Sequence, residues 1–182
     1  LEPVYRAAGD WGRLVDAYEI LVATSEEPQE RVERLVAIRS IYEERLGQLD
    51  RAFQAAARAW REAPTREDLL SGLERLGKLS GSVEELIGVL EDQAEALPYV
   101  SEERAALRLR VARYAENLLQ DRARAVEAYR RAVEERPDAL AALEALERLH
   151  AKAGEHRELV DVLKKMAGIL EQRSEEHTSE LQ

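Results

Sequence analysis

Apolar residues recur along the chain at spacings of three and four, which is the period of one face of an α-helix. Leu14, Tyr18 and Leu21 form one such line, and Leu143 and Leu146 lie on another. No segment shows the sustained alternation of apolar and polar residues that is typical of a half-buried β-strand. The pattern therefore predicts an all-α protein.

Glycine and proline mark the breaks between these helical lines. Glycine permits the left-handed backbone that ends a helix, and proline cannot continue the helical hydrogen bonds. Pro64 and Pro137 are expected to end helices, and Thr65 and Ser101 are expected to cap the helices that follow. The predicted helices run, after a helical stub at 1–8, over about 10–25, 29–46, 49–62, 66–79, 83–97, 102–119, 121–135, 139–153 and 156–172.

The sequence also repeats itself. Segments that begin at Leu1, Leu73 and Leu146 align with one another, and a second class of segment begins at Ile41 and Arg113. The long period of 72 or 73 residues is therefore built of two unlike half-units, each a helix, a turn and a second helix. A single helical hairpin buries too little apolar surface to fold alone, so each unit is expected to stabilise its neighbour.

A unit of this length and kind resembles the tetratricopeptide repeat. In the fourth unit, Ala125, Tyr129, Ala132 and Pro137 stand at the spacing of that family's small residue, aromatic residue, alanine and closing proline. The resemblance implies a right-handed α-solenoid of about five helix-turn-helix repeats over residues 1–172. The units are expected at about 1–28, 29–65, 66–100, 101–138 and 139–172.

Some positions depart from the family's pattern. Glu74 and Glu147 replace the small residue midway along the first helix, and the first helices of the second and fourth units are longer by a residue or more. Two tryptophans lie near second helices. We expect Trp11 to hold two hairpins together, and Trp60 to belong to the core or to a helix cap.

The last ten residues, 173–182, differ in character from the rest. They read RSEEHTSELQ, bring hydroxyl residues into a chain otherwise poor in them, and resemble the translation of a common sequencing adapter. We therefore predict a non-native tail, with a native polar tail as the alternative. Residues 174–182 hold three glutamates and no lysine or arginine, so the net charge without them changes from −10 to −7.

Composition excludes several functions. An acidic chain, with a pI near 5.0, is a poor candidate for binding nucleic acid through phosphate contacts. The absence of cysteine excludes disulfides and thiolate metal sites. Neither a membrane-spanning apolar run nor a signal peptide is visible, and the compartment stays unassigned. The high proportion of arginine to lysine suggests a bacterial source, and the start at Leu1 suggests a fragment of a longer protein.

No catalytic motif is present. The sequence contains no P-loop, no dinucleotide-binding glycine turn and no HExxH, so we expect neither an enzyme nor a cofactor or metal site. His150 and His156 lie on either side of a predicted turn, and His156 is expected to be a packing or surface residue.

The resemblance directs attention to basic residues on the first helices, which line the concave groove of tetratricopeptide arrays. The positions carried over through the turn glycines are Arg75, Lys78, Arg108, Arg148 and Lys152. A basic groove in an acidic protein would accept an acidic peptide segment or a terminal carboxylate. The alternative is that these side chains are solvated and balance nearby glutamates.

Three functions are consistent with this sequence. The first is a scaffold that binds a partner protein or peptide in the groove. The second is an accessory arm of a larger enzyme or sensor whose catalytic domain lies outside this sequence. The third is a self-assembling structural rod, and the sequence leaves the oligomeric state open.

Overall fold

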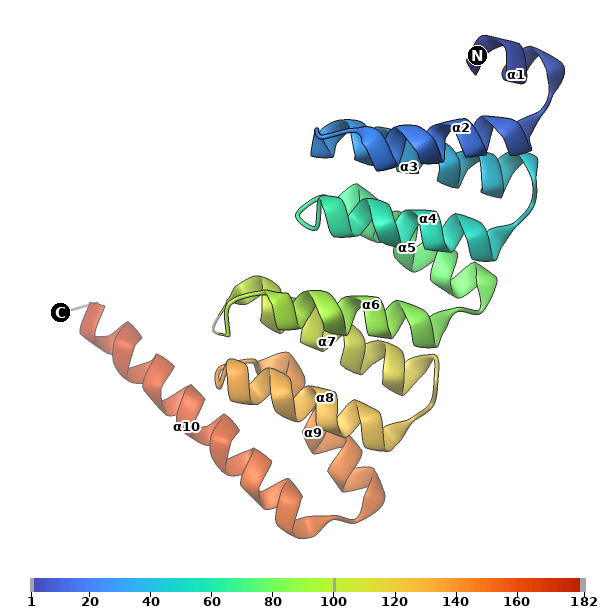
Figure 1. Cartoon of the computed structure of the whole chain (residues 1–182). Coiled ribbons are helices and arrows are strands. Elements are labelled where there is room, and N and C mark those ends of the chain that lie inside the picture. Colours follow the sequence, from blue (N-terminus) through green and yellow to red (C-terminus); the bar gives the residue numbers. More distant parts are fainter. Residues whose placement is uncertain (1, 100, 181–182) are drawn as a thin grey trace. The chain divides into compact units, whose positions relative to one another are not determined.

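The computed structural model describes residues 2–99 and 101–180, and in those residues the regular structure is helical throughout (Figure 1). The chain divides into two compact units, Leu1–Val89 and Leu90–Gln182. The helices are α1 (Glu2–Ala8), α2 (Trp11–Thr24), α3 (Pro28–Ser40), the π-helical segment η1 (Ile41–Arg45), α4 (Leu49–Glu62), α5 (Glu67–Ser80), α6 (Val83–Ala96), α7 (Glu102–Asn117), α8 (Arg122–Glu135), α9 (Leu140–Ala153) and α10 (His156–Glu180).

The prediction of an all-α fold is confirmed, and the predicted helix ends agree with the structure to within two residues except at the end of α10. The proline assignments are also correct, because α4 ends at Glu62 before Pro64 and α8 ends at Glu135 before Pro137. The chain builds helix pairs in which a first helix and a second helix are joined by a short turn.

Small side chains allow neighbouring helices to approach closely. Ala52, Ala56 and Ala59 line α4 and are all buried, and α4 packs against both α3 and α5. In the same unit Leu14 of α2 is fully buried and Trp60 of α4 is 1% exposed. Within this compact unit, the apolar stripes that predicted the helices are thus the surfaces by which neighbouring helices cover one another.

The turns are of two kinds, and they explain the two classes of half-unit. After α1 and α9 the helix is closed by a bond that reaches five residues back, from Asp10 N to Tyr5 O and from Glu155 N to His150 O, both of 3.0 Å. In the second unit the corresponding turn holds one more residue, and its closing bond of 2.8 Å reaches six residues back, from Gln48 N to Tyr42 O.

The fourth unit has the same wide turn. The bond from Asp121 N to Ala115 O, of 2.9 Å, again reaches six residues back. In the second unit the extra residue also widens the helix into η1. The prediction of longer first helices in these two units is confirmed, because α3 with η1 spans residues 28–45 and α7 has 16 residues, whereas α5 and α9 have 14 each.

Gln120 occupies the left-handed turn position that glycine holds in the other units. Its φ is +56°, and it is the one non-glycine residue with positive φ among the described residues. A side chain in this conformation strains the backbone, so Gln120→Gly should raise the free energy of unfolding by about 0.5–1 kcal/mol.

Urea denaturation followed by circular dichroism measures this change. The reverse substitution, Gly154→Gln, should lower stability by a similar amount, because Gly154 has a φ of +72° and an added Cβ would meet no other atom within 4 Å. Equal stabilities for the Gln120→Gly variant and the parent would contradict the strain argument.

One of the two predicted helix caps is correct. The Ser101 side chain accepts a hydrogen bond of 3.1 Å from Arg104 N at the start of α7. The prediction for Thr65 is wrong, because α5 begins at Glu67 and Arg66 occupies the cap position without a side-chain hydrogen bond. Thr65 lies one residue too early for its hydroxyl to reach the first free amides.

The predicted end of the last helix at residue 172 is also wrong, since α10 continues through Glu180. Residues 181 and 182 lie outside the described residues. The interpretation of residues 173–182 as a translated adapter concerns the origin of the segment and stays a prediction.

Candidate binding surface

Arg75 and Glu43 form a two-pronged ion pair in the compact unit Leu1–Val89. The Arg75 guanidinium, on α5, donates hydrogen bonds of 2.6 and 2.8 Å to the two carboxylate oxygens of Glu43, on η1. The glutamate side chain is 20% exposed and the arginine side chain 47% exposed. Hydrogen bonding from Arg75 lowers the pKa of the Glu43 carboxyl, and partial burial opposes that effect.

Arg148 and Glu116 form the equivalent pair in the compact unit Leu90–Gln182. Arg148, on α9, donates bonds of 2.5 and 3.0 Å to the Glu116 carboxylate of α7. The Tyr129 hydroxyl donates a third bond of 3.1 Å to the same carboxylate. Hydrogen bonding from Arg148 lowers the pKa of Glu116, whereas burial, followed by the bond to Glu116, raises the pKa of Tyr129 to about 12.

The two ion pairs occupy matching positions of the long repeat. Arg75 and Arg148 are 73 residues apart, as are Glu43 and Glu116. In each pair a carboxylate that is mostly buried holds a guanidinium that is about half exposed. Exposed pairs of this kind stabilise a fold by only about 0–1 kcal/mol, so their main effect here is to fix the direction of the arginine.

The two predicted lysines lie close to these pairs in sequence and on the surface. Lys78 follows Arg75 on α5, Lys152 follows Arg148 on α9, and both side chains are exposed. The charge of Lys152 contributes to the low pKa of Glu116. Within each unit the structure therefore brings the predicted arginine and lysine to the same first helix.

Arg108 is not on this surface. It is only 2% exposed, and its Nε donates a bond of 3.2 Å to Glu135 of α8 while its Nη2 bonds to Glu95 of α6. The expectation of a groove-lining cation at this position is therefore wrong. The reason is that position 108 corresponds to Leu35 of the second unit, a core position that is 1% exposed.

The sequence reasoning missed a second repeated ion pair. Arg31 donates to Glu62 at 2.7 Å, and Arg104 donates to Glu135 at 2.8 Å, again 73 residues further along. The matching Arg and Glu at this offset were visible in the sequence and could have predicted the pairs. The Arg104–Glu135 pair is buried and joined by Arg108, which makes it a core network.

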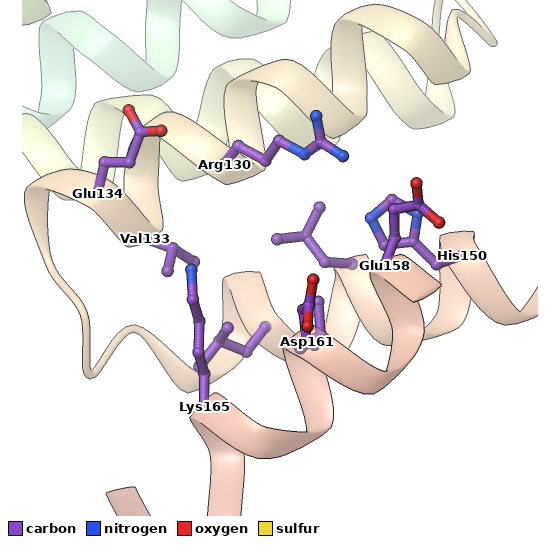
Figure 2. A pocket seen from close by; sticks show the side chains of 10 residues that line it. Arg130, Val133, Glu134, His150, Glu158, Asp161 and Lys165 are labelled. Carbon is purple, nitrogen blue, oxygen red and sulfur yellow. The ribbon is translucent and has the colours of Figure 1, made fainter. Parts of the chain in front are cut away.

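A cleft between α8, α9 and α10 is the second place where charged groups gather (Figure 2). Its walls mix two cations and three carboxylates with apolar residues and one histidine: Arg130, Val133, Glu134, Leu143, Leu146, His150, Glu158, Asp161, Val162 and Lys165. This mixture of charges favours no single class of charged ligand.

The repeat explains why the cleft is open. Val133 corresponds to Trp60, which lies 73 residues earlier and has a buried indole. Because valine is smaller than tryptophan, it leaves space at position 133. His150 lies at 2% exposure with its Nδ1 2.6 Å from a Glu155 carboxylate oxygen, and His156 is exposed. The expectation that His156 is a packing or surface residue is confirmed, since it lies on the surface.

Neither metal binding nor membrane insertion finds support in the described residues. Among the side chains that the structure describes, those of residues 2–99 and 101–172, no three His, Asp or Glu residues are arranged to hold a metal ion. Every helix in that part of the chain is too short or too polar to span a bilayer.

Comparisons with known proteins agree with this architecture. The tetratricopeptide-repeat family model matches residues 1–32. The crystal structure of MamA superimposes with a TM-score of 0.51 at 18% identity, covering 96% of this chain and 97% of that one. The structure of BtubC (BKLC) from P. vanneervenii gives 0.52 at 15% identity, covering 96% and 78%.

A third solved structure, of a putative kinesin light chain from Podosopora anserina with nearly identical TPR-like repeats, gives a TM-score of 0.49 at 20% identity and covers 95% of this chain and 93% of that one. A search of curated protein sequences finds no match. The family match over the first unit and the repeated hairpins together identify the fold as a tetratricopeptide-like helical repeat.

Proposed function

We propose that this chain is a protein-interaction module that binds acidic segments of a partner protein on its first helices. Tetratricopeptide-like repeats expose long, regular surfaces, which suits them to hold a protein or peptide ligand. The observation that carries the proposal is the recurrence, at 73 residues, of a half-exposed arginine held by a mostly buried glutamate.

The geometry of these pairs favours a carboxylate ligand. A guanidinium has five N–H donors, and each glutamate engages one on each terminal nitrogen, which leaves three for a ligand. Because the glutamate fixes the guanidinium plane, less conformational entropy is lost when a second carboxylate binds. In the second pair Lys152 adds a positive charge near the carboxylate, and that charge contributes to the low pKa of Glu116.

The test is the binding of a fluorescein-labelled peptide of alternating Glu and Leu, measured by fluorescence anisotropy. We expect an affinity on the order of micromolar, since a flexible peptide loses entropy on binding. The combined Arg75→Glu and Arg148→Glu substitutions should weaken it at least about tenfold, because they reverse the charge that meets the ligand.

The matched control is Arg58→Glu, which reverses an arginine of α4 that also forms a two-pronged pair, with Glu19 of α2. This variant changes the net charge on second helices and should leave the affinity within about twofold. Unchanged binding by the Arg75→Glu, Arg148→Glu variant, or an equal loss in the Arg58→Glu control, would rule out the proposed surface.

A further inference from the structure

Arg39, near the end of α3, has no ionic partner within the described residues. Its side chain is partly buried, and its Nε atom is buried without a hydrogen bond. No carboxylate of the described residues forms an ion pair with its guanidinium. Because an arginine keeps its charge and carries five N–H donors, this side chain retains donors for an external ligand.

The guanidinium of Arg39 lies against Gly72 of α5. A Cβ atom added to Gly72 would lie 3.0 Å from Nη1 of Arg39, so the arginine reaches from α3 to α5 at a point where α5 has no side chain. A larger residue at position 72 would therefore force the guanidinium to move.

Arg39 and the Arg75–Glu43 pair share one surface. Arg75 follows Gly72 by three residues on α5, and Glu43 follows Arg39 by four residues, so each of these spacings keeps two residues on one side of a helix. Hydrogen bonding from Arg75 is the main cause of the lowered pKa of Glu43, and the charge of Arg39 lowers that pKa further. Both arginines are therefore close to the same carboxylate, although only Arg75 is bonded to it.

The matching positions of the long repeat show that the fold does not require this arginine. Ala112 and Ala145 stand 73 residues after Arg39 and Gly72, and both are buried. Arginine and glycine in place of two alanines give up apolar burial and helix propensity, and within the described residues the arginine gains no ion pair in return. A bound anion would supply the missing partner.

We infer that Arg39 is a second guanidinium of the Arg75 site and binds a carboxylate of the acidic segment. The inference rests on the proposed function, and it goes further by naming a binding residue that only one of the two repeated sites possesses. Glu43 directs Arg75 and Gly72 leaves room for Arg39, so two guanidinium groups with unused donors meet the same ligand.

The test measures the anisotropy of the labelled Glu–Leu peptide in an Arg148→Ala background, so that binding reports the Arg75 site. Arg39→Ala in that background should weaken binding at least about fivefold, because it removes a charge that meets the ligand. Gly72→Leu should cause a similar loss without removing any charge, because the new side chain displaces the guanidinium. The two changes together should weaken binding no more than Arg39→Ala alone, since both act through one group.

Two controls match these changes. Arg34→Ala removes an arginine of the same helix whose guanidinium lies 5.6 Å from the ring centroid of Tyr18, and it should leave the affinity within about twofold. Gly88→Leu adds the same side chain to a glycine of α6 where a Cβ would meet no atom within 4 Å, and it should also leave binding unchanged. If Gly72→Leu loses helix content, Gly72→Ala replaces it, with an expected loss of at least about twofold.

Equal binding by the Arg148→Ala background and by a folded Arg39→Ala or Gly72→Leu variant would overturn this inference, and the proposed function would stand if Arg75→Glu still removed binding. Losses in the two controls as large as those in the variants would also overturn it. Binding by the parent but not by the Arg148→Ala background would assign the ligand to the Arg148 site and overturn the inference. Absence of binding by the parent would overturn the proposed function, and this inference with it.

Discussion

Replacing Glu135 by alanine should lower the free energy of unfolding by about 3–5 kcal/mol, because it leaves two buried guanidinium groups short of their counter-charge. One Glu135 oxygen accepts from Arg104 Nε at 2.8 Å and from Arg108 Nε at 3.2 Å, and all three residues are at most 7% exposed. Glu95 bonds to both arginines but is itself 59% exposed, so it offsets only part of the loss. Urea denaturation followed by far-ultraviolet circular dichroism measures the change.

Arg108→Leu is the matched control for this network. The equivalent residue of the second unit is Leu35, which packs in the core at 1% exposure without a charge. The variant keeps the Arg104–Glu135 pair, just as Arg31–Glu62 persists beside Leu35. We expect a cost below about 1 kcal/mol, since a buried charge is exchanged for apolar packing. A Glu135→Ala cost no larger than that of Arg108→Leu would show that the buried charges do not depend on this carboxylate.

Trp60→Ala should lower the free energy of unfolding by about 3–5 kcal/mol, as Glu135→Ala does. It removes the largest buried side chain of the compact unit Leu1–Val89 and leaves a cavity. The indole is 1% exposed, and its Nε1–H donates a bond of 3.1 Å to Pro64 O just beyond the end of α4. Truncation also leaves that carbonyl without its donor. The midpoint of thermal unfolding should fall together with the urea midpoint.

Trp60→Val and Trp11→Ala are the controls. Valine stands at position 133, which corresponds to Trp60 and lines the open cleft. Trp60→Val should therefore cost less stability than Trp60→Ala. Trp11 is only partly buried and lies 5.0 Å beneath the Arg45 guanidinium, which links the first two hairpins as predicted. Its removal should cost about 1–2 kcal/mol. Equal costs for Trp60→Ala and Trp11→Ala would contradict the assignment of the core.

Apolar spacing and helix-ending residues were sufficient to predict the helices, because both signals are local. The wide turns after η1 and α7 were visible only as a difference in repeat length. The sequence does not show that the extra residue is absorbed by hydrogen bonds reaching six residues back, as from Gln48 N to Tyr42 O. The sequence likewise does not decide whether Thr65 or Arg66 occupies the cap position of α5, because the two residues are adjacent.

The candidate site was predicted less well, because its geometry depends on distant residues. Counting from the turn glycines located Arg75 and Arg148 correctly on first helices, but Glu43 and Glu116, which fix the two guanidinium groups, belong to the preceding first helices. Arg108 was assigned to the groove by carrying the family's groove positions over from the turn, although it lies further upstream, where the register can slip. Its burial requires carboxylates from α6 and α8, and no pattern within α7 reveals them.

The account rests on the claim that the first helices, and not the second helices, receive an acidic ligand. Amide NMR shift mapping during titration with the Glu–Leu peptide tests this claim most directly. We predict that saturating shifts cluster around Arg75 and Lys78 of α5 and around Arg148 and Lys152 of α9. Shifts confined to the second helices α4 and α8, or no shifts at peptide concentrations well above micromolar, would contradict it.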